Sequence, residues 1–164
     1  MKYKRFEELP VWNDAVALAA QVFSFGRDAE LRRLGDAANQ LERAALSVSN
    51  NIAEGFERGT TQEMLTFIYY ARGSAGEVRS ILHVLDRVQG ITHLQPEICN
   101  LKSLAESISR QLRAWAGTLQ NSDIKGTRYT NDETRERAES RKRADAFMAK
   151  LKDITDAARL KSVI

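Results

Sequence analysis

The side chains best suited to nucleophilic or metal chemistry are one thiol, Cys99, and two imidazoles, His83 and His93. A catalytic thiol needs a neighbouring base, and no histidine stands one helical turn from Cys99. A di-iron helical site needs Glu-x-x-His pairs on two helices, and the sequence contains none. The stretch Gly73-Ser74-Ala75-Gly76 lacks the lysine and the spacing of a P-loop, so we interpret it as a flat surface for close helix approach. The sequence therefore predicts no catalytic residue, no metal and no cofactor, and an inert, buried Cys99.

A more distinctive pattern is a polar stripe that runs beside an apolar one on a single predicted helix. Its members lie three or four positions apart: Arg43, Ser47, Asn51 and Glu54. The next predicted helix offers Tyr70, Ser74 and Glu77. One interpretation is a seam of hydrogen bonds between the helices. Replacing Asn51 or Glu54 by alanine would then lower the free energy of unfolding by about 1 to 3 kcal/mol, because a buried partner would lose its hydrogen bond. The other is a contact with a ligand or RNA. We favour the seam because it needs no ligand to explain it.

Charge is distributed unevenly along the 164 residues, although the formal net charge is only +3. Residues 1–121 hold 14 Lys and Arg against 14 Asp and Glu, whereas residues 122–164 hold 11 against 8. Binding to a polyanion would therefore depend first on basic residues near the two ends of the chain: Lys2, Lys4, Arg5, Arg135, Arg137, Arg141, Lys142 and Arg143. The next candidates are Arg43, Arg58 and Arg72. Acidic residues interleaved in the tail favour the alternative that these charges only solvate an exposed helix.

Four segments with apolar residues at helical spacing must position these groups. The first runs from Pro10 to Phe25, and the second from about Asp36 to Glu54, with Gly55 as its stop signal. The third begins at the capping box Thr60-x-x-Glu63 and ends at Gly90, and the fourth runs from Pro96 to about Leu119. Because the connections between these segments are short, the four helices can bury their apolar stripes only against one another. We therefore expect an all-α, antiparallel up-down-up-down four-helix bundle over residues 1–121.

The chain beyond the bundle has a different character. Residues 122–131 lose the apolar pattern and are predicted to form a linker. Residues 132–164 form a charged, partly amphipathic helix or flexible tail, with an apolar stripe of four side chains that could dock a partner: Phe147, Met148, Leu151 and Ile154.

The sequence also indicates a compartment. Cys99 has no partner for an intrachain disulfide, and the N-terminus lacks an apolar signal core. The longest apolar run, residues 15–20, is far shorter than the ~20 residues of a membrane span. We expect a cytoplasmic protein without a membrane partner.

Three motifs resemble a known family. They are Phe6-Glu7-Glu8-Leu9-Pro10-Val11-Trp12, the whole stretch from Gln40 to Gly55, and the stretch from Phe67 to Glu77. Over residues 6–120 the chain resembles the four-helix-bundle proteins encoded in intervening sequences of bacterial 23S ribosomal RNA genes. Related bundles serve as the accessory variability determinant of diversity-generating retroelements, where they accompany a reverse transcriptase. The resemblance implies a ring-shaped homopentamer without catalytic activity, with RNA, DNA or a ribonucleoprotein as partner.

The sequence departs from the family pattern at several places. Glu42 stands where a second basic residue is usual, Ser49-Asn50 replaces Pro-Ala, and the first connector is atypical. These changes remove positive charge but keep the apolar periodicity, so they bear on RNA binding more than on fold. The function expected is a non-enzymatic, nucleic-acid-associated homo-oligomer. The alternative is a protein interaction scaffold whose tail helix docks a partner protein.

Overall fold

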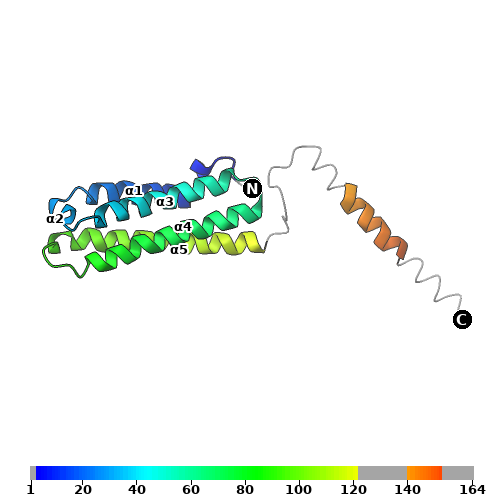
Figure 1. The fold of residues 1–164 in the computed structure, drawn as a ribbon. Coiled ribbons are helices and arrows are strands. Elements are labelled where there is room, and N and C mark those ends of the chain that lie inside the picture. Colours follow the sequence, from blue (N-terminus) through cyan, green and yellow to red (C-terminus); the bar gives the residue numbers. More distant parts are fainter. Residues whose placement is uncertain (1–2, 122–139, 153–164) are drawn as a thin grey trace, which may run out of the picture. The chain divides into compact units, whose positions relative to one another are not determined.

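The computed structural model describes residues 3–121 and 140–152. These residues contain helices and no strand, which confirms the predicted all-α class. Four long helices lie side by side in Figure 1: α1 (Pro10–Phe25), α3 (Ala37–Glu57), α4 (Thr61–Leu85) and α5 (Gln95–Gln120). Three short elements flank or connect them: η1 (Phe6–Glu8), α2 (Ala29–Arg32) and η2 (Thr92–Leu94). The predicted 122–131 linker lies outside the described residues. A separate unit of the chain contributes a helix at residues 140–152.

The packing of the long helices follows their apolar stripes. Helix α1 packs against α3 and α5, and α4 packs against the same two helices. Among the described residues α1 and α4 do not contact each other, so they lie diagonally across the core. Small residues such as Ala15, Ala45 and Ala75 are fully buried and let the helices approach closely, while larger ones such as Phe56 and Met64 fill the space between. Together, residues 3–121 form one helical domain.

Local signals in the sequence account for most helix ends. Pro10 stands in the first turn of α1, where its missing N–H removes no hydrogen bond. The capping box is formed as predicted, because the Glu63 N–H donates to Thr60 Oγ1 over 3.2 Å and Thr60 Oγ1 donates to Glu63 Oε2 over 2.7 Å. The connector after α1 contains the short helix α2, which Asp28 caps.

Two predicted helix ends were wrong. Helix α3 continues past Gly55 to Glu57, and Gly55 is buried where α3 meets α4. An ideal Cβ on Gly55 would lie 2.6 Å from the Cβ of Phe67, so this glycine serves a close approach and not a stop. Helix α4 ends at Leu85, before Gly90, and Lys102 of α5 donates to the carboxylate of its C-cap residue Asp86 over 2.7 Å.

Two further expectations about small side chains were also wrong. Cys99 is exposed, since its neighbour Ile98 faces the core and each residue turns the helix by about 100°. Gly73 and Gly76 are exposed, and an added Cβ at either position would meet no atom within 4 Å. Neither glycine therefore makes a close helix approach within the domain.

Candidate nucleic-acid interface

An aromatic surface on α4 is the most distinctive outward feature of the helical domain. Residues of α4 such as Ile68 and Ala71 face the core, so the residues between them point outward. Tyr69 is 42% exposed and Tyr70 is 57% exposed. The Tyr70 ring meets the half-buried Phe67 ring edge to face, with 5.7 Å between centroids. We call these three residues the α4 aromatic surface.

Two arginines lie beside these rings. The guanidinium carbon of Arg58, at the end of α3, lies 5.3 Å from the centroid of Phe67. That of Arg72, on α4 itself, lies 5.8 Å from the centroid of Tyr69. A cation over an aromatic face is attracted by the ring quadrupole. The two arginines are therefore held at the edge of the aromatic surface.

Arg72 differs from the other basic residues that the sequence singled out on the domain. It makes no ion pair with any described residue, and its Nε is buried without a hydrogen-bond partner among them. A buried donor that lacks a partner costs about 1 to 3 kcal/mol. Because Arg72 is also not paired with a described carboxylate, its guanidinium group is a candidate for contact with a molecule outside the chain.

Three other basic candidates on the domain bind carboxylates of their own chain. Arg43 Nη2 lies 3.1 Å from Asp36, Arg58 Nη2 lies 2.6 Å from Glu54, and Arg5 Nη2 lies 2.6 Å from Glu7. The hydrogen bond from Arg5 lowers the pKa of Glu7. The pKa of Asp36 is lowered first by a hydrogen bond from Asn39 and then by one from Arg43. Lys4 is exposed. These internal pairs reduce the positive potential that the domain presents to a phosphate backbone.

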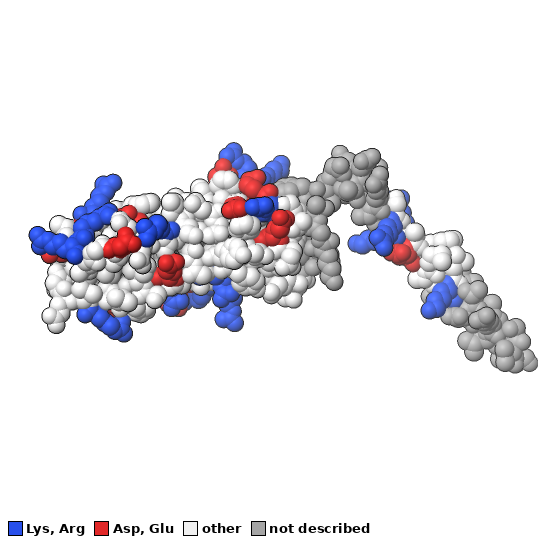
Figure 2. Space-filling view, viewed as in Figure 1, with Lys and Arg blue, Asp and Glu red and all other residues white. Residues whose placement is uncertain are grey.

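The tail candidates divide between described and undescribed residues. Lys2, Arg135, Arg137 and Ile154 lie outside the described residues. Arg141, Lys142 and Arg143 are exposed on the helix at residues 140–152, where Figure 2 shows basic side chains. Phe147, Met148 and Leu151 are exposed on the same helix. This helix therefore presents both charge and apolar surface.

Among the described residues of the polar stripe, one hydrogen bond joins α3 to α4. Ser47 Oγ and Ser74 Oγ are 3.0 Å apart, and Asn51 Nδ2 donates to the Ser47 carbonyl and hydroxyl over 2.8 and 3.0 Å. The Ser74 hydroxyl also lies within 3.1 Å of the Tyr70 carbonyl. Glu54 is exposed and pairs with Arg58, and Glu77 is exposed as well. The interhelical part of the stripe is thus shorter than the sequence suggests.

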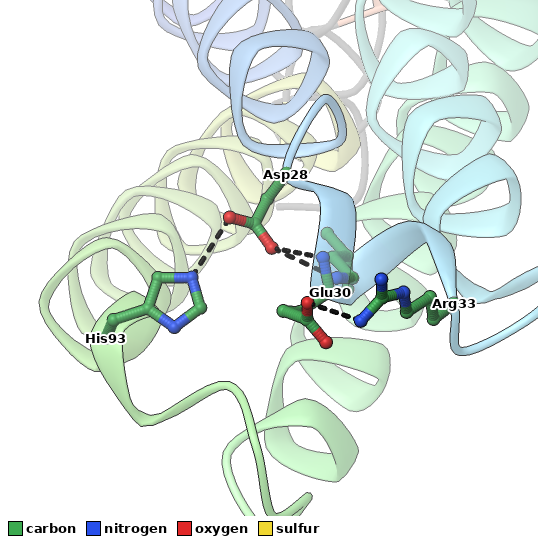
Figure 3. A network of polar contacts seen from close by, with 5 residues as sticks. Asp28, Glu30, Arg33 and His93 are labelled. Carbon is green, nitrogen blue, oxygen red and sulfur yellow. Dashed lines mark hydrogen bonds and ion pairs between the residues drawn. The ribbon is translucent and has the colours of Figure 1, made fainter.

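One polar cluster escaped the sequence analysis. Figure 3 shows Asp28 between α1 and α2, where its Oδ1 accepts from the N–H groups of Glu30 and Leu31 over 3.0 Å each. Its Oδ2 lies 3.0 Å from His93 Nε2, which comes from η2. The hydrogen bond with His93 is the main cause that lowers the pKa of Asp28. Asp28 followed by three helix formers is an N-cap signal, but nothing local indicates His93, which is 65 residues away.

A shallow cleft of about 500 Å³ adjoins this cluster and is lined by residues of α1 and α5 together with Asp28 and Arg27. Within residues 3–121 and 140–152, no three His, Cys, Asp or Glu side chains are placed to hold a metal ion. None of the helices described has the length and apolar character to cross a membrane.

Comparison with known proteins decides the family. The profile of the 23S rRNA-intervening sequence protein family matches residues 7–114. The chain belongs to this family. The comparison with curated proteins finds no match. The part that matches the intervening-sequence family contains the α4 aromatic surface with Arg43, Arg58 and Arg72, whereas the helix at residues 140–152 lies beyond it.

An ion pair joins α3 to the connector between α1 and α3. Glu42, which is only 17% exposed, binds Arg32 of α2 with 2.7 Å between Oε1 and Nη2. A Cβ on Gly26 would collide with the same carboxylate. Glu42 on α3 and the connector between α1 and α3 therefore contact each other.

Proposed function

We propose that this protein is a cytoplasmic, non-enzymatic homo-oligomer that binds single-stranded nucleic acid on the α4 aromatic surface. The observation that carries the proposal is the pair of exposed tyrosine rings, Tyr69 and Tyr70, with arginines at their edge. Unpaired bases stack on aromatic rings and on guanidinium planes, and each stacked base contributes about 1 to 3 kcal/mol. The family's description refers to 23S rRNA, so RNA is the first nucleic acid to test.

The charge of the domain favours stacking over phosphate contacts. Residues 1–121 carry equal numbers of basic and acidic residues, and Arg43 and Arg58 pair with carboxylates of their own chain. Binding on the aromatic surface should therefore depend weakly on salt, whereas binding through many lysines and arginines would weaken steeply as salt rises.

Self-association would raise the affinity of such a surface. The two tryptophans offer little surface for such a contact, because Trp12 packs on Phe6 with 5.1 Å between centroids and Trp115 is half-buried. Phe23 of α1 and Leu46 of α3 are 40% and 42% exposed, however, and line one shallow cleft. We place the contact between copies on this α1–α3 face of an antiparallel up-down-up-down bundle. Helix α4 lies diagonally opposite α1, so each copy keeps its aromatic surface open.

Fluorescence anisotropy with a labelled single-stranded RNA tests the proposal. Tyr70→Ala should weaken binding about 5- to 150-fold, the equivalent of one stacked base. Val84→Ala is a matched control, since Val84 is 61% exposed on the same helix but outside the aromatic surface. Failure of the parent protein to bind RNA or DNA would refute the proposal, and equal affinity of parent and Tyr70→Ala would remove the site from α4.

Light scattering tests the oligomer separately. The mass of the full chain at micromolar concentration should exceed that of a monomer, and Leu46→Ser should reduce it. The pentamer and a reverse transcriptase partner rest on the family resemblance alone. Co-purification with a reverse transcriptase encoded nearby would support that partner. A monomer that binds no nucleic acid would favour the interaction-scaffold alternative.

A further inference from the structure

The helix at residues 140–152 combines positive charge with exposed apolar side chains. It is strongly basic, with five lysines and arginines against the single acidic residue Asp145. It also exposes large apolar side chains: Phe147 is 63% exposed, Met148 is 65% exposed and Leu151 is 43% exposed. A helix with both properties is typical of a segment that binds a surface and not of one that contributes to a core.

The order of residues separates the two properties around the helix. At about 100° per residue, Ala144, Phe147, Met148 and Leu151 fall in one stripe. Arg141 and Lys152 lie on one side of that stripe, Arg143 and Lys150 lie on the other, and Lys142 lies opposite. Cations thus flank the apolar stripe on both edges.

We propose that this helix binds the surface of an anionic lipid bilayer and lies in the plane of the headgroups. The apolar stripe would enter the boundary between headgroups and acyl chains. The long stems of the flanking lysines and arginines would then keep their charges at the level of the lipid phosphates. A bilayer can bury the apolar stripe and bind the cations on both of its edges at the same time.

A nucleic acid would contact fewer of the exposed side chains of this helix than a bilayer would. A phosphate backbone would use the cations but would leave Met148 and Leu151 in water, and the helix has one aromatic ring for stacking. An acidic protein groove could take the stripe, but it would have to supply carboxylates along two edges. This proposal departs from the expectation that the chain has no membrane partner. That expectation rested on the lack of an apolar run long enough to span a membrane, whereas an interfacial helix needs only an apolar stripe.

Co-sedimentation of the full chain with vesicles tests the proposal. Vesicles of phosphatidylcholine and phosphatidylglycerol in equal parts should bind the protein, and vesicles of phosphatidylcholine alone should not. Replacing Arg141, Lys142 and Arg143 together by glutamine should lower binding to the anionic vesicles about 100-fold, because each basic residue near such a surface contributes about fivefold. Phe147→Ser should lower it at least about tenfold.

The matched control is Val84→Ser, which removes an equally exposed apolar side chain from α4 and should bind vesicles like the parent. Binding to single-stranded RNA is measured for the same variants, so that the two proposals fail separately. Phe147→Ser should leave RNA affinity unchanged if the helix binds lipid. Equal binding to neutral vesicles, no binding to either kind, or a loss of RNA affinity in Phe147→Ser without a loss of vesicle binding would overturn the proposal.

Discussion

Replacement of Gly55 by alanine should destabilise the helical domain even though alanine is the better helix former. The new Cβ would lie 2.6 Å from the Cβ of Phe67 and 3.1 Å from the sulfur of Met64. The Met64 side chain can rotate, but the Cβ of Phe67 is fixed to the backbone of α4. Helices α3 and α4 would therefore have to separate at this point.

The size of the effect follows from two opposing contributions. Overpacking of a core contact costs about 1 to 3 kcal/mol. Alanine in place of glycine inside a helix returns up to about 1 kcal/mol. Since a contact between two Cβ atoms has little freedom to relax, we expect a net loss of about 1 to 2 kcal/mol in the free energy of unfolding. The displacement of Phe67 should also weaken RNA binding, because Arg58 and Tyr70 lie against its ring.

Urea unfolding followed by circular dichroism measures this change. Gly73→Ala is the matched control, since Gly73 lies inside α4 and an added Cβ there meets nothing within 4 Å. That variant should be more stable than the parent by about 0.5 to 1 kcal/mol. The reasoning about close approach is refuted if Gly55→Ala raises the urea midpoint as Gly73→Ala does, with equal slopes of unfolding free energy against urea.

Three further outcomes are expected. The pKa of Asp28 is lower in the folded protein than in the unfolded chain, where it is about 4. The hydrogen bond between Asp28 and His93 therefore stabilises the fold above about pH 4, and this contribution is lost as pH falls through the folded-state pKa of Asp28. Asp28→Asn should therefore flatten the acid limb of a stability curve measured by thermal unfolding. Ser47→Ala should cost about 1 kcal/mol in urea unfolding, whereas Glu54→Ala should cost less than about 1 kcal/mol because its ion pair is exposed. Cys99 should react with a thiol reagent in the folded protein at the rate of an exposed thiol, and a thiol that reacts only in denaturant would show that it is buried.

Much of the helical domain was predictable because its information is local. The first helix from Pro10 to Phe25 and the capping box at Thr60 follow from residues within a few positions. The errors arose where a residue type has two uses. Gly55 could end a helix or permit a close approach, and only the position of Phe67 on the next helix distinguishes them. The contact of Asp28 with His93 joins two turns that no local pattern connects.

The candidate site was predictable only in part. The sequence singles out Tyr70 and Arg72, but not the ring contacts that hold Arg58 and Arg72 beside the aromatic surface. It ranks the basic residues by their place along the chain, whereas the structure neutralises some of them by pairing. That distinction depends on which carboxylates the fold brings near, as Asp36 lies near Arg43.

The pair formed by Arg32 and Glu42 limits how this chain could have diverged from its relatives. A change of Glu42 alone to a basic residue would leave two cations in contact at a half-buried position beside Gly26. We therefore expect the acidic residue and the α2 connector to vary together. Among related chains, an arginine at position 32 should occur with an acidic residue at position 42, and chains with a basic residue there should carry a different connector.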